Sequence, residues 1–327
     1  MFANTIYLGL LLLVSSTFAD TSVSILDCSS FRSDKEIIQS LSFRVLINPS
    51  TSNSPIYNSY AIVNGQGQVI ELTLSTIDYI PLSIFCLKNL QSLTVQYSSN
   101  ITIPEAISRL SGVLKTFNLI SVSRALILPT ELFKITSLRY LTIIGSGLAV
   151  LPDEIGQMRL LSNLTLTSNQ LRSLPASLSK IMGLRSLKVD NNELLTSLDG
   201  LNGNLQLTEL SASNCAIDHL PKNLTNLQMI NMDGNQLTTL DGLGSITSFT
   251  SRSMIFSKNN ITSLPTTINA FLTVENMDLS NNLLTELPMW LYNIQLKNIN
   301  VRHNSFQEKE KEWIQGMFRL TNTNVHI

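Results

Sequence analysis

The sequence holds little charge and no surplus of either sign. Lys, Arg, Asp and Glu make up 14% of its 327 residues, and the formal net charge is −1 at pH 7. Proteins that hold nucleic acid or anionic lipid by electrostatics present a basic surface, because cations contact the phosphates. The composition therefore argues against nucleic acid and against a charged membrane surface as partners.

Residues that commonly carry catalysis are also sparse. The chain has 3 histidines, His219, His303 and His326, and none has a carboxylate or thiol partner at a spacing that suggests a site. It has no glycine-rich loop that leads into a helix, as a phosphate site requires, and no paired-cysteine spacing for a metal. The sequence predicts a protein without enzymatic activity, cofactor or metal.

Long apolar runs are absent beyond the first residues. Ile6 to Val14 is apolar and small residues follow up to Ala19, which predicts a signal peptide over residues 1–19, cleaved before Asp20. A membrane anchor is the alternative, but the run is shorter than the roughly 20 apolar residues that span a bilayer. We expect a secreted, extracellular protein with no membrane insertion after cleavage.

What the chain has in abundance is a repeat. The pattern Leu-x-x-Leu-x-Leu-x-x-Asn-x-Leu-x-x-Leu-Pro recurs about every 23 residues, most fully from Leu161 to Pro175 and again from Val274 to Pro288. A period of this length indicates a solenoid, in which each turn buries its apolar face against the next. The turns begin at Val69, Leu90, Leu114, Leu138, Leu161, Leu184, Leu207, Leu227, Ser251, Val274 and Leu296.

Each repeat contains a strand and then a tighter turn. The segment Leu164-Thr165-Leu166 alternates apolar and polar residues, as a half-buried strand does. Pro175 follows, and then Leu178, Ile181 and Leu184 at three-residue spacing, which indicates a short helix or 3-10 turn that begins at the proline. We expect the strands to form one parallel sheet on the concave side, with the helical turns on the convex side.

These repeats resemble those of the leucine-rich repeat family, in its short Leu-Pro type and secreted form, over most of the chain after Val69. The resemblance implies an α/β solenoid: a right-handed, curved array with a parallel concave sheet and short helices or 3-10 turns on the convex side. Together with the N-terminal run and the repeat positions, this predicts a signal peptide (1–19), an N-terminal cap (20–68), about eleven repeats (69–306) and a capping helix with a tail (307–327).

The Asn position of the pattern is expected to hold the turns together. A buried Asn side chain can bond backbone groups of its own turn and of the adjacent turn. Ile77, Ser98, Val122 and Ser146 stand at this position in early turns, so we expect a less regular N-terminal third. The later turns carry Asn169, Asn192, Asn235, Asn259, Asn282 and Asn304.

The 3 cysteines leave one without a partner. Cys28 and Cys86 flank the segment before the regular repeats, where a disulfide could stabilise an N-terminal cap in an oxidising compartment; two unpaired buried thiols are the alternative. Cys215 stands at the Asn position of its turn, where the family resemblance implies a buried, free thiol.

Both ends of the solenoid need a cap, because the core is otherwise open there. A short helix is indicated around Asp34 to Ile38. An amphipathic helix is indicated from Phe306 to Leu320, with four residues predicted to face the last turn: Trp313, Ile314, Met317 and Phe318.

A partner is expected to bind the outward positions of the strands. These positions are mostly neutral hydroxyls and amides, with scattered charge from Lys188 onward. Binding energy concentrates on Tyr, Trp and Arg, so the few such residues are included among the candidates. The candidate binding residues are Tyr97, Tyr140, Lys188, Asp190, Glu209, Asp233, Lys258, Asp278 and Arg302.

Four Asn-x-Ser/Thr acceptor triplets are consistent with secretion and predict glycosylation. They begin at Asn100, Asn163, Asn223 and Asn260. We expect Asn163 to lie in a strand on the concave face, where a glycan would obstruct binding, and Asn100 and Asn223 to lie outside the strands.

Three functions remain open. The first, implied by the resemblance, is a secreted, non-enzymatic recognition protein that binds a protein or glycan on its concave face. The second is an intracellular signalling scaffold, because Leu-Pro repeats are similar to those of Ras-pathway and cell-polarity scaffolds. The third is an ice- or polysaccharide-binding surface formed by Thr73, Thr94, Thr142 and Thr165, a row that Asn118 interrupts.

Overall fold

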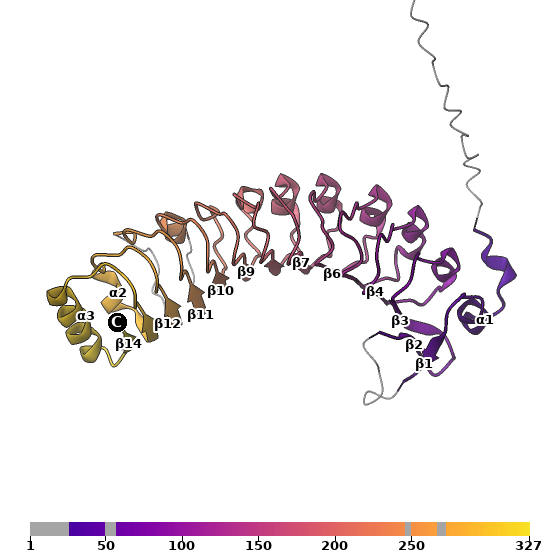
Figure 1. Cartoon of the computed structure of the whole chain (residues 1–327), viewed down its shortest axis with the longest axis horizontal. Helices are drawn as coiled ribbons and strands as arrows, with labels where there is room; N and C mark the ends of the chain where they lie inside the picture. Colours follow the sequence, from indigo (N-terminus) through magenta and orange to yellow (C-terminus); the bar gives the residue numbers. More distant parts are fainter. Residues whose placement is uncertain (1–25, 50–56, 246–249, 267–272) are drawn as a thin grey trace, which may run out of the picture.

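The chain forms a curved solenoid with strands on its concave side and short helical turns on its convex side (Figure 1). The computed structural model describes residues 26–49, 57–245, 250–266 and 273–327, so the predicted signal peptide lies outside the described residues. The strands of these described ranges belong to one 14-stranded sheet whose spatial order follows the chain from β1 to β14. In the described ranges, no helix has the length and hydrophobicity needed to span a bilayer.

The eleven strands that the repeat predicts are present as β3 to β13, and neighbouring strands among them pair in parallel. They are β3 (Val69–Ser75), β4 (Ser92–Gln96), β5 (Thr116–Ile120), β6 (Tyr140–Ile144), β7 (Asn163–Thr165), β8 (Ser186–Lys188), β9 (Glu209–Ser211), β10 (Met229–Asn231), β11 (Thr250–Ile255), β12 (Thr273–Asp278) and β13 (Gln295–Asn300).

The predicted parallel pairing of the repeat strands is confirmed, and the sheet extends beyond the repeats at its N-terminal end. Here β1 (Val45–Ile47) and β2 (Ser59–Val63) precede β3, and β2 runs antiparallel to β3. The physical reason is the short connection, since a tight turn can join only antiparallel neighbours. Asn64 closes that turn by accepting hydrogen bonds from the backbone N–H groups of Gln66 and Gln68. At the other end β14 (Asn324–His326) pairs with β13.

Short helices cover the convex side and begin after a proline in most turns. Proline suits this place because its ring sets φ and it has no N–H to leave unbonded. The elements are η3 (Leu82–Cys86), η4 (Glu105–Leu110), η5 (Thr130–Lys134), η6 (Asp153–Gln157), η7 (Ala176–Lys180), η8 (Asp199–Leu201), η9 (Asp241–Ser245) and α2 (Trp290–Asn293).

In η8, glycine takes a place where the backbone of the previous turn comes very close. A Cβ at Gly200 would lie 2.6 Å from the carbonyl oxygen of Leu174 and 2.7 Å from that of Pro175. The segment from Leu198 to Leu201 therefore forms a close turn on the convex side, and a side chain at Gly200 would push two turns of the solenoid apart.

The Asn ladder bonds each turn to its neighbours as expected. Asn192 is fully buried: its side-chain NH₂ donates to the carbonyls of Leu166 (3.0 Å) and Val189 (2.6 Å), and its Oδ1 accepts from the N–H of Leu171 (3.0 Å). Cys215 takes this position in the next turn as a buried, free thiol, and burial raises its pKa to about 11.

The early turns replace this ladder in part with serine. Ser98 Oγ accepts from the N–H of Ile77 at 3.1 Å, and Ser146 Oγ accepts from the N–H of Val122 at 3.3 Å. A hydroxyl therefore satisfies one backbone N–H of the preceding turn, although it lacks the second donor and the reach of an amide.

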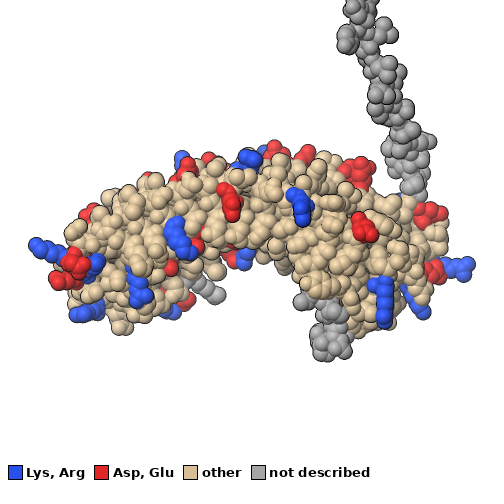
Figure 2. All heavy atoms as spheres, in the orientation of Figure 1, with Lys and Arg blue, Asp and Glu red and all other residues tan. Residues whose placement is uncertain are grey.

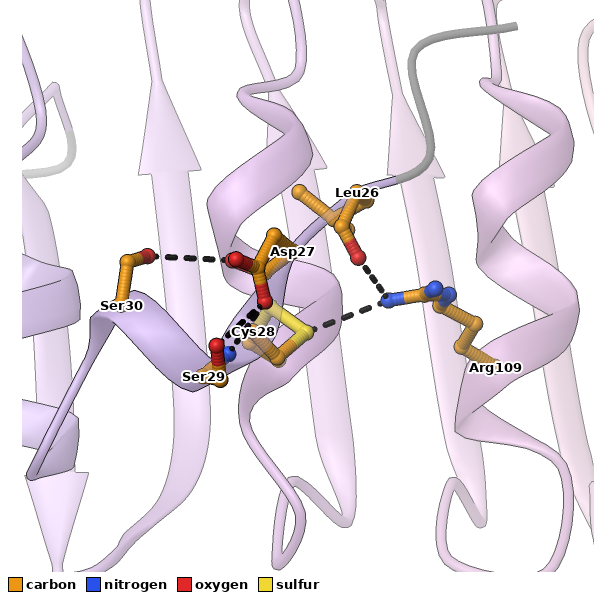
Figure 3. Close-up of a disulfide and its surroundings, with 7 residues drawn as sticks. Leu26, Asp27, Cys28, Ser29, Ser30 and Arg109 are labelled. Carbon is orange, nitrogen blue, oxygen red and sulfur yellow. Dashed lines mark hydrogen bonds between the residues drawn. A yellow bond between two sulfur atoms is a disulfide. The ribbon is translucent and has the colours of Figure 1, made fainter.

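The N-terminal cap is joined to the convex side by the expected disulfide between Cys28 and Cys86 (Figure 3). Cys28 begins η1 (Cys28–Ser30), and Cys86 ends η3. The guanidinium of Arg109, from η4, donates to the carbonyl of Leu26 at 2.9 Å and to Cys28 Sγ at 3.1 Å. Helix α1 (Asp34–Gln39) forms where the sequence indicated one, with Ser33 as its N-cap.

The C-terminal cap is α3 (Glu308–Leu320), at the far left of Figure 1. Ile314 and Phe318 are fully buried and Met317 packs against the core, as predicted. The prediction was wrong for Trp313, which is 52% exposed. Ile314 and Phe318 form the buried line, and Trp313 and Met317 are each rotated by roughly 100° from it onto the flank of the helix, where Met317 contacts the core and Trp313, one turn earlier, does not.

Candidate binding face

The concave face is organised in rows, because the repeat strands pair in register and every second side chain points outward. The central row consists of Thr73, Thr94, Asn118, Thr142, Thr165, Lys188, Ser211, Asn231, Ile255, Asp278 and Asn300. One side of this row lies toward the amino ends of the strands and the other toward their carboxyl ends.

The half of the face formed by β4 to β7 carries no charged side chain among its paired strand positions. Instead of charged side chains, this half carries apolar residues at the carboxyl ends of its strands. Ile120 pairs directly with Ile144, both are partly exposed, and Tyr97 lies beside them because its N–H bonds the carbonyl of Ile120 at 2.9 Å. We call Tyr97, Ile120 and Ile144 the apolar stripe.

Tyr97 occupies an unusual backbone position for an aromatic residue. Its φ is +50°, and the corresponding residue in other turns is small or polar, such as Ser121 or Asn191. The left-handed region costs an L-residue about 1–2 kcal/mol. The Tyr97 ring packs against that of Tyr57, with centroids 5.3 Å apart. A bulky residue in an unfavourable conformation on an exposed face is a reason to look for a binding role.

The other half of the face, from β8 onward, carries charges that are largely paired with one another. Lys188 Nζ lies 2.8 Å from Glu209 Oε1, and Ser186 donates to the same carboxylate at 2.6 Å. Burial acts to raise the pKa of Glu209, but the hydrogen bonds from Lys188 and Ser186 outweigh it and hold the pKa below its ordinary value.

The aspartates of this half mainly join neighbouring turns. Asp190 Oδ1 accepts from Ser211 Oγ at 2.6 Å and from both the N–H and the hydroxyl of Ser213 at 2.8 and 2.7 Å. Asp233 accepts from Lys258 Nζ at 3.0 Å and from the Ser257 hydroxyl at 2.7 Å. Much of the bonding capacity of these carboxylates is therefore already used within the sheet.

The remaining candidates are not brought together. Tyr140 lies at the amino end of β6, on the opposite side of the central row from Tyr97. Asp278 accepts from the N–H and hydroxyl of Ser280 within its own turn. Arg302 follows β13, near the far end of the solenoid. Seen from the side, charged side chains are scattered over the arc and gather at its two ends (Figure 2).

A hollow of about 200 Å³ lies over β8 to β11, next to the Lys188–Glu209 pair. Exposed Met229 and partly exposed Ile255 line it, and neither residue is among the candidates predicted from the sequence. Ile120 and Ile144 are likewise absent from the predicted candidates. Met229, Ile255, Ile120 and Ile144 could have been identified from the sequence, because they are apolar residues at outward strand positions. Tyr57 lies in the irregular cap, where no repeat pattern indicates its position.

The four acceptor asparagines differ in their surroundings. Asn163 lies in β7 on the concave face and is half-buried, next to Tyr140 in the paired register. Asn100, Asn223 and Asn260 are exposed outside the strands. A glycan on Asn163 would cover the middle of the face, and one on any of the other three would leave it open.

The expectation that the histidines lack carboxylate partners was wrong for His219. Its Nδ1 bonds Asp218, and its Nε2 lies 3.3 Å from Asp199 Oδ2, which comes from the preceding turn. The hydrogen bond with Asp218 and then that with Asp199 raise the pKa of His219 above its ordinary value of 6.5, although burial acts against them. Sequence spacing missed Asp199 because the stacking of turns brings it near. The described residues contain no cluster of three or more metal-ligating side chains.

No family model and no curated protein matches the sequence. Solved structures do match. The leucine-rich repeat ectodomain of the Arabidopsis receptor kinase HAESA, in complex with an extended IDA peptide hormone, has 21% identity and a TM-score of 0.57 over 80% of this chain and 44% of that chain. The Toll–Spätzle complex of Drosophila has 19% identity and a TM-score of 0.58 over 77% and 40%. A plant ice-binding protein has 19% identity and a TM-score of 0.52 over 76% of each chain.

These matches define the class of fold. The chain is an α/β solenoid with the leucine-rich repeat fold. It spans less than half the length of the matched chains in the HAESA and Toll–Spätzle structures. At these identities the likeness shows the fold alone, because a fold hosts many functions and the function depends on the surface residues.

Proposed function

We propose that this chain is a secreted, non-enzymatic recognition protein that binds a protein partner on the concave face, centred on the apolar stripe. The observation that carries the proposal is the pairing of Ile120 with Ile144 beside Tyr97, on a stretch of sheet that has no charge. Aromatic and aliphatic side chains at the centre of an interface contribute most of the binding energy, and charged residues are depleted there.

The sequence left a protein or a glycan open as the partner of this face. The stripe favours a protein, because its isoleucines offer apolar area and no hydrogen bonds. The structural neighbours include a receptor ectodomain in complex with a peptide hormone and the Toll–Spätzle complex, so the fold accommodates such partners. The partner segment that fits here is uncharged and carries at least one large apolar side chain.

Secretion rests on the N-terminal sequence and the cysteines. The run Ile6 to Val14 and Ala19 fit a cleaved signal peptide. The disulfide between Cys28 and Cys86 suits an oxidising compartment. Intact-mass analysis of the protein recovered from culture medium tests this directly: we expect a chain that begins at Asp20 and carries glycans. A protein that begins at Met1 without glycans would favour the intracellular scaffold.

The binding face is tested by capture of partners from extracellular fluid with the wild-type protein and with Ile120→Asp. Ile127→Asp is the matched control, because Ile127 is 82% exposed and lies outside the strands. We expect a captured protein to be lost with Ile120→Asp and retained with Ile127→Asp. Equal capture by both variants would exclude the stripe as the binding centre.

A second candidate rests on the row of threonines, and the fold of a plant ice-binding protein gives a reason to test it. Thr94, Thr142 and Thr165 are partly exposed in one row, but Thr73 is buried, and Asn118 interrupts the row with a hydrogen bond to Thr94 at 3.0 Å. A curved sheet matches a flat crystal plane poorly, so we expect no thermal hysteresis. Hysteresis that disappears with Thr142→Tyr would favour this candidate.

A further inference from the structure

A second hollow lies at the N-terminal end of the solenoid, next to the apolar stripe, because its lining residue Tyr57 packs against Tyr97. It has a volume of about 310 Å³ and is lined by residues that precede β1, lead into β2 and follow β3. These segments meet here because β2 runs antiparallel to β3, so that the start of β2 lies beside the end of β3. β1 pairs in parallel with β2, so its start lies there too. The strands of the regular repeats are all parallel, so the start of one strand does not lie beside the end of its neighbour there.

The lining combines flat aromatic rings with polar side chains. Tyr57 is 64% exposed and Tyr79 is 58% exposed, and both line the hollow. Arg44, Asn58 and Asp78 line it as well. Within the described part of the chain, no hydrogen bond or ion pair occupies these three side chains, so their bonding capacity is open to a ligand.

The chemistry of these groups restricts the ligand. Arg44 only donates, Asp78 in its ionised form only accepts, and Asn58 does both. One cation and one anion leave the hollow without net charge, which disfavours a phosphate or another strongly charged ligand. An apolar ligand would leave the polar groups without partners. A molecule with many groups that both donate and accept matches this set, provided that it also has a face of C–H groups to lie against a tyrosine ring.

A neutral saccharide has these properties. Its hydroxyls donate and accept, and the C–H face of its ring packs on an aromatic face, which carries negative charge density. A volume of about 310 Å³ is at the low end of ligand sites, which span roughly 300–1,000 Å³. We propose that the hollow formed by Arg44, Tyr57, Asn58, Asp78 and Tyr79 is a binding site for one or two rings of an uncharged saccharide. A peptide segment would fit a long groove along the strands better than this compact hollow.

The proposal is tested with the full secreted protein, freed of its own N-glycans by an endoglycosidase. The probes are cellobiose, N,N′-diacetylchitobiose, mannobiose and lactose, each followed by ligand-observed NMR. A capped Ser-Gly-Tyr-Ser-Gly peptide is the competing probe. We expect at least one disaccharide to bind, and Tyr79→Ala to raise its Kd by about tenfold or more, because the ring supplies the stacking face.

Asp78→Ala is a second variant that removes an exposed acceptor without disturbing the core. This variant is expected to weaken binding of the same disaccharide. Ile120→Asp, in the apolar stripe, is expected to leave that binding unchanged. The saccharide site and the protein-binding face can therefore fail separately. Absence of binding by all four disaccharides would overturn the proposal, as would binding that both hollow variants leave intact. Tyr79-dependent binding of the peptide alone would reassign the site to peptides.

Discussion

Asp190 and Ser213 join two neighbouring turns of the solenoid on its concave face. Asp190 Oδ1 accepts the backbone N–H of Ser213 at 2.8 Å and its hydroxyl at 2.7 Å. By sequence, Asp190 was a candidate contact for a partner. In the structure its carboxylate satisfies a partly buried backbone group of the next turn, so its first role is in stability.

We therefore expect Asp190→Ala to lower the free energy of unfolding by about 1–3 kcal/mol, because the N–H of Ser213 loses its acceptor. Urea denaturation followed by circular dichroism measures the change. Lys188→Ala is the control, since an exposed ion pair contributes at most about 1 kcal/mol. Equal losses of unfolding free energy for the two variants would show that Asp190 contributes no more to stability than an ordinary surface charge.

The Asn ladder predicts a larger effect at Asn192. Asn192→Ala leaves the N–H of Leu171 and the carbonyls of Leu166 and Val189 without their partner. Each buried group left unbonded costs about 1–3 kcal/mol, so this variant is expected to lose more stability than Asp190→Ala. Asn191→Gly is the adjacent control. Its φ is +56°, which glycine adopts freely, so its change is expected to stay within about 0.5 kcal/mol.

The disulfide closes a long loop, with Cys28 and Cys86 separated by 58 positions. The double variant Cys28→Ser, Cys86→Ser is expected to be less stable by about 2–4 kcal/mol, because the unfolded chain gains the entropy that the loop removes. In the wild-type protein, thiol titration is expected to find one thiol after denaturation, that of Cys215, and none before it. Three reactive thiols after denaturation without a reductant would contradict the pairing.

His219 predicts a pH dependence. Its pKa is raised in the folded protein, first by Asp218 and then by Asp199. A raised pKa means that the folded state binds the proton more tightly. Protonated His219 therefore stabilises the folded protein. This stabilisation is complete below the pKa of His219 in the unfolded chain, about 6.5, and disappears as the pH rises through its pKa in the folded protein. The effect on stability is small because the side chain is largely solvated.

NMR titration of the His219 ring measures this pKa directly. We expect Asp218→Asn to lower it more than Asp199→Asn, since Asp218 contributes more. A pKa at or below 6.5 in the wild-type protein would show that the two carboxylates do not hold the ring.

The repeat made most of the fold predictable because its spacing sets both the strand period and the burial of leucine. Strands β3 to β13 formed where the register placed them. Trp313 shows the limit of this approach. A helical pattern identifies the buried residues near Ile314 and Phe318, but the exact edge of the buried face depends on how α3 lies against the last turn.

The candidate site was less predictable, because it depends on which outward residues become neighbours. Ile120 and Ile144 are far apart in the sequence and each is unremarkable in its own turn. Only the pairing of β5 with β6 makes them a continuous apolar surface. In the same way, Asp199 reaches His219 only because successive turns stack.

The sequence by itself determined the solenoid, its concave sheet, the Asn ladder and the unequal distribution of charge along the face, because these follow from a local pattern repeated turn by turn. The tertiary structure decided what those residues do. It paired Lys188 with Glu209, and it bonded Asp190 to the backbone of the next turn. It also reversed β2 against β3 and so created a hollow at the cap. These relationships depend on distances between turns, which no local pattern in the sequence specifies.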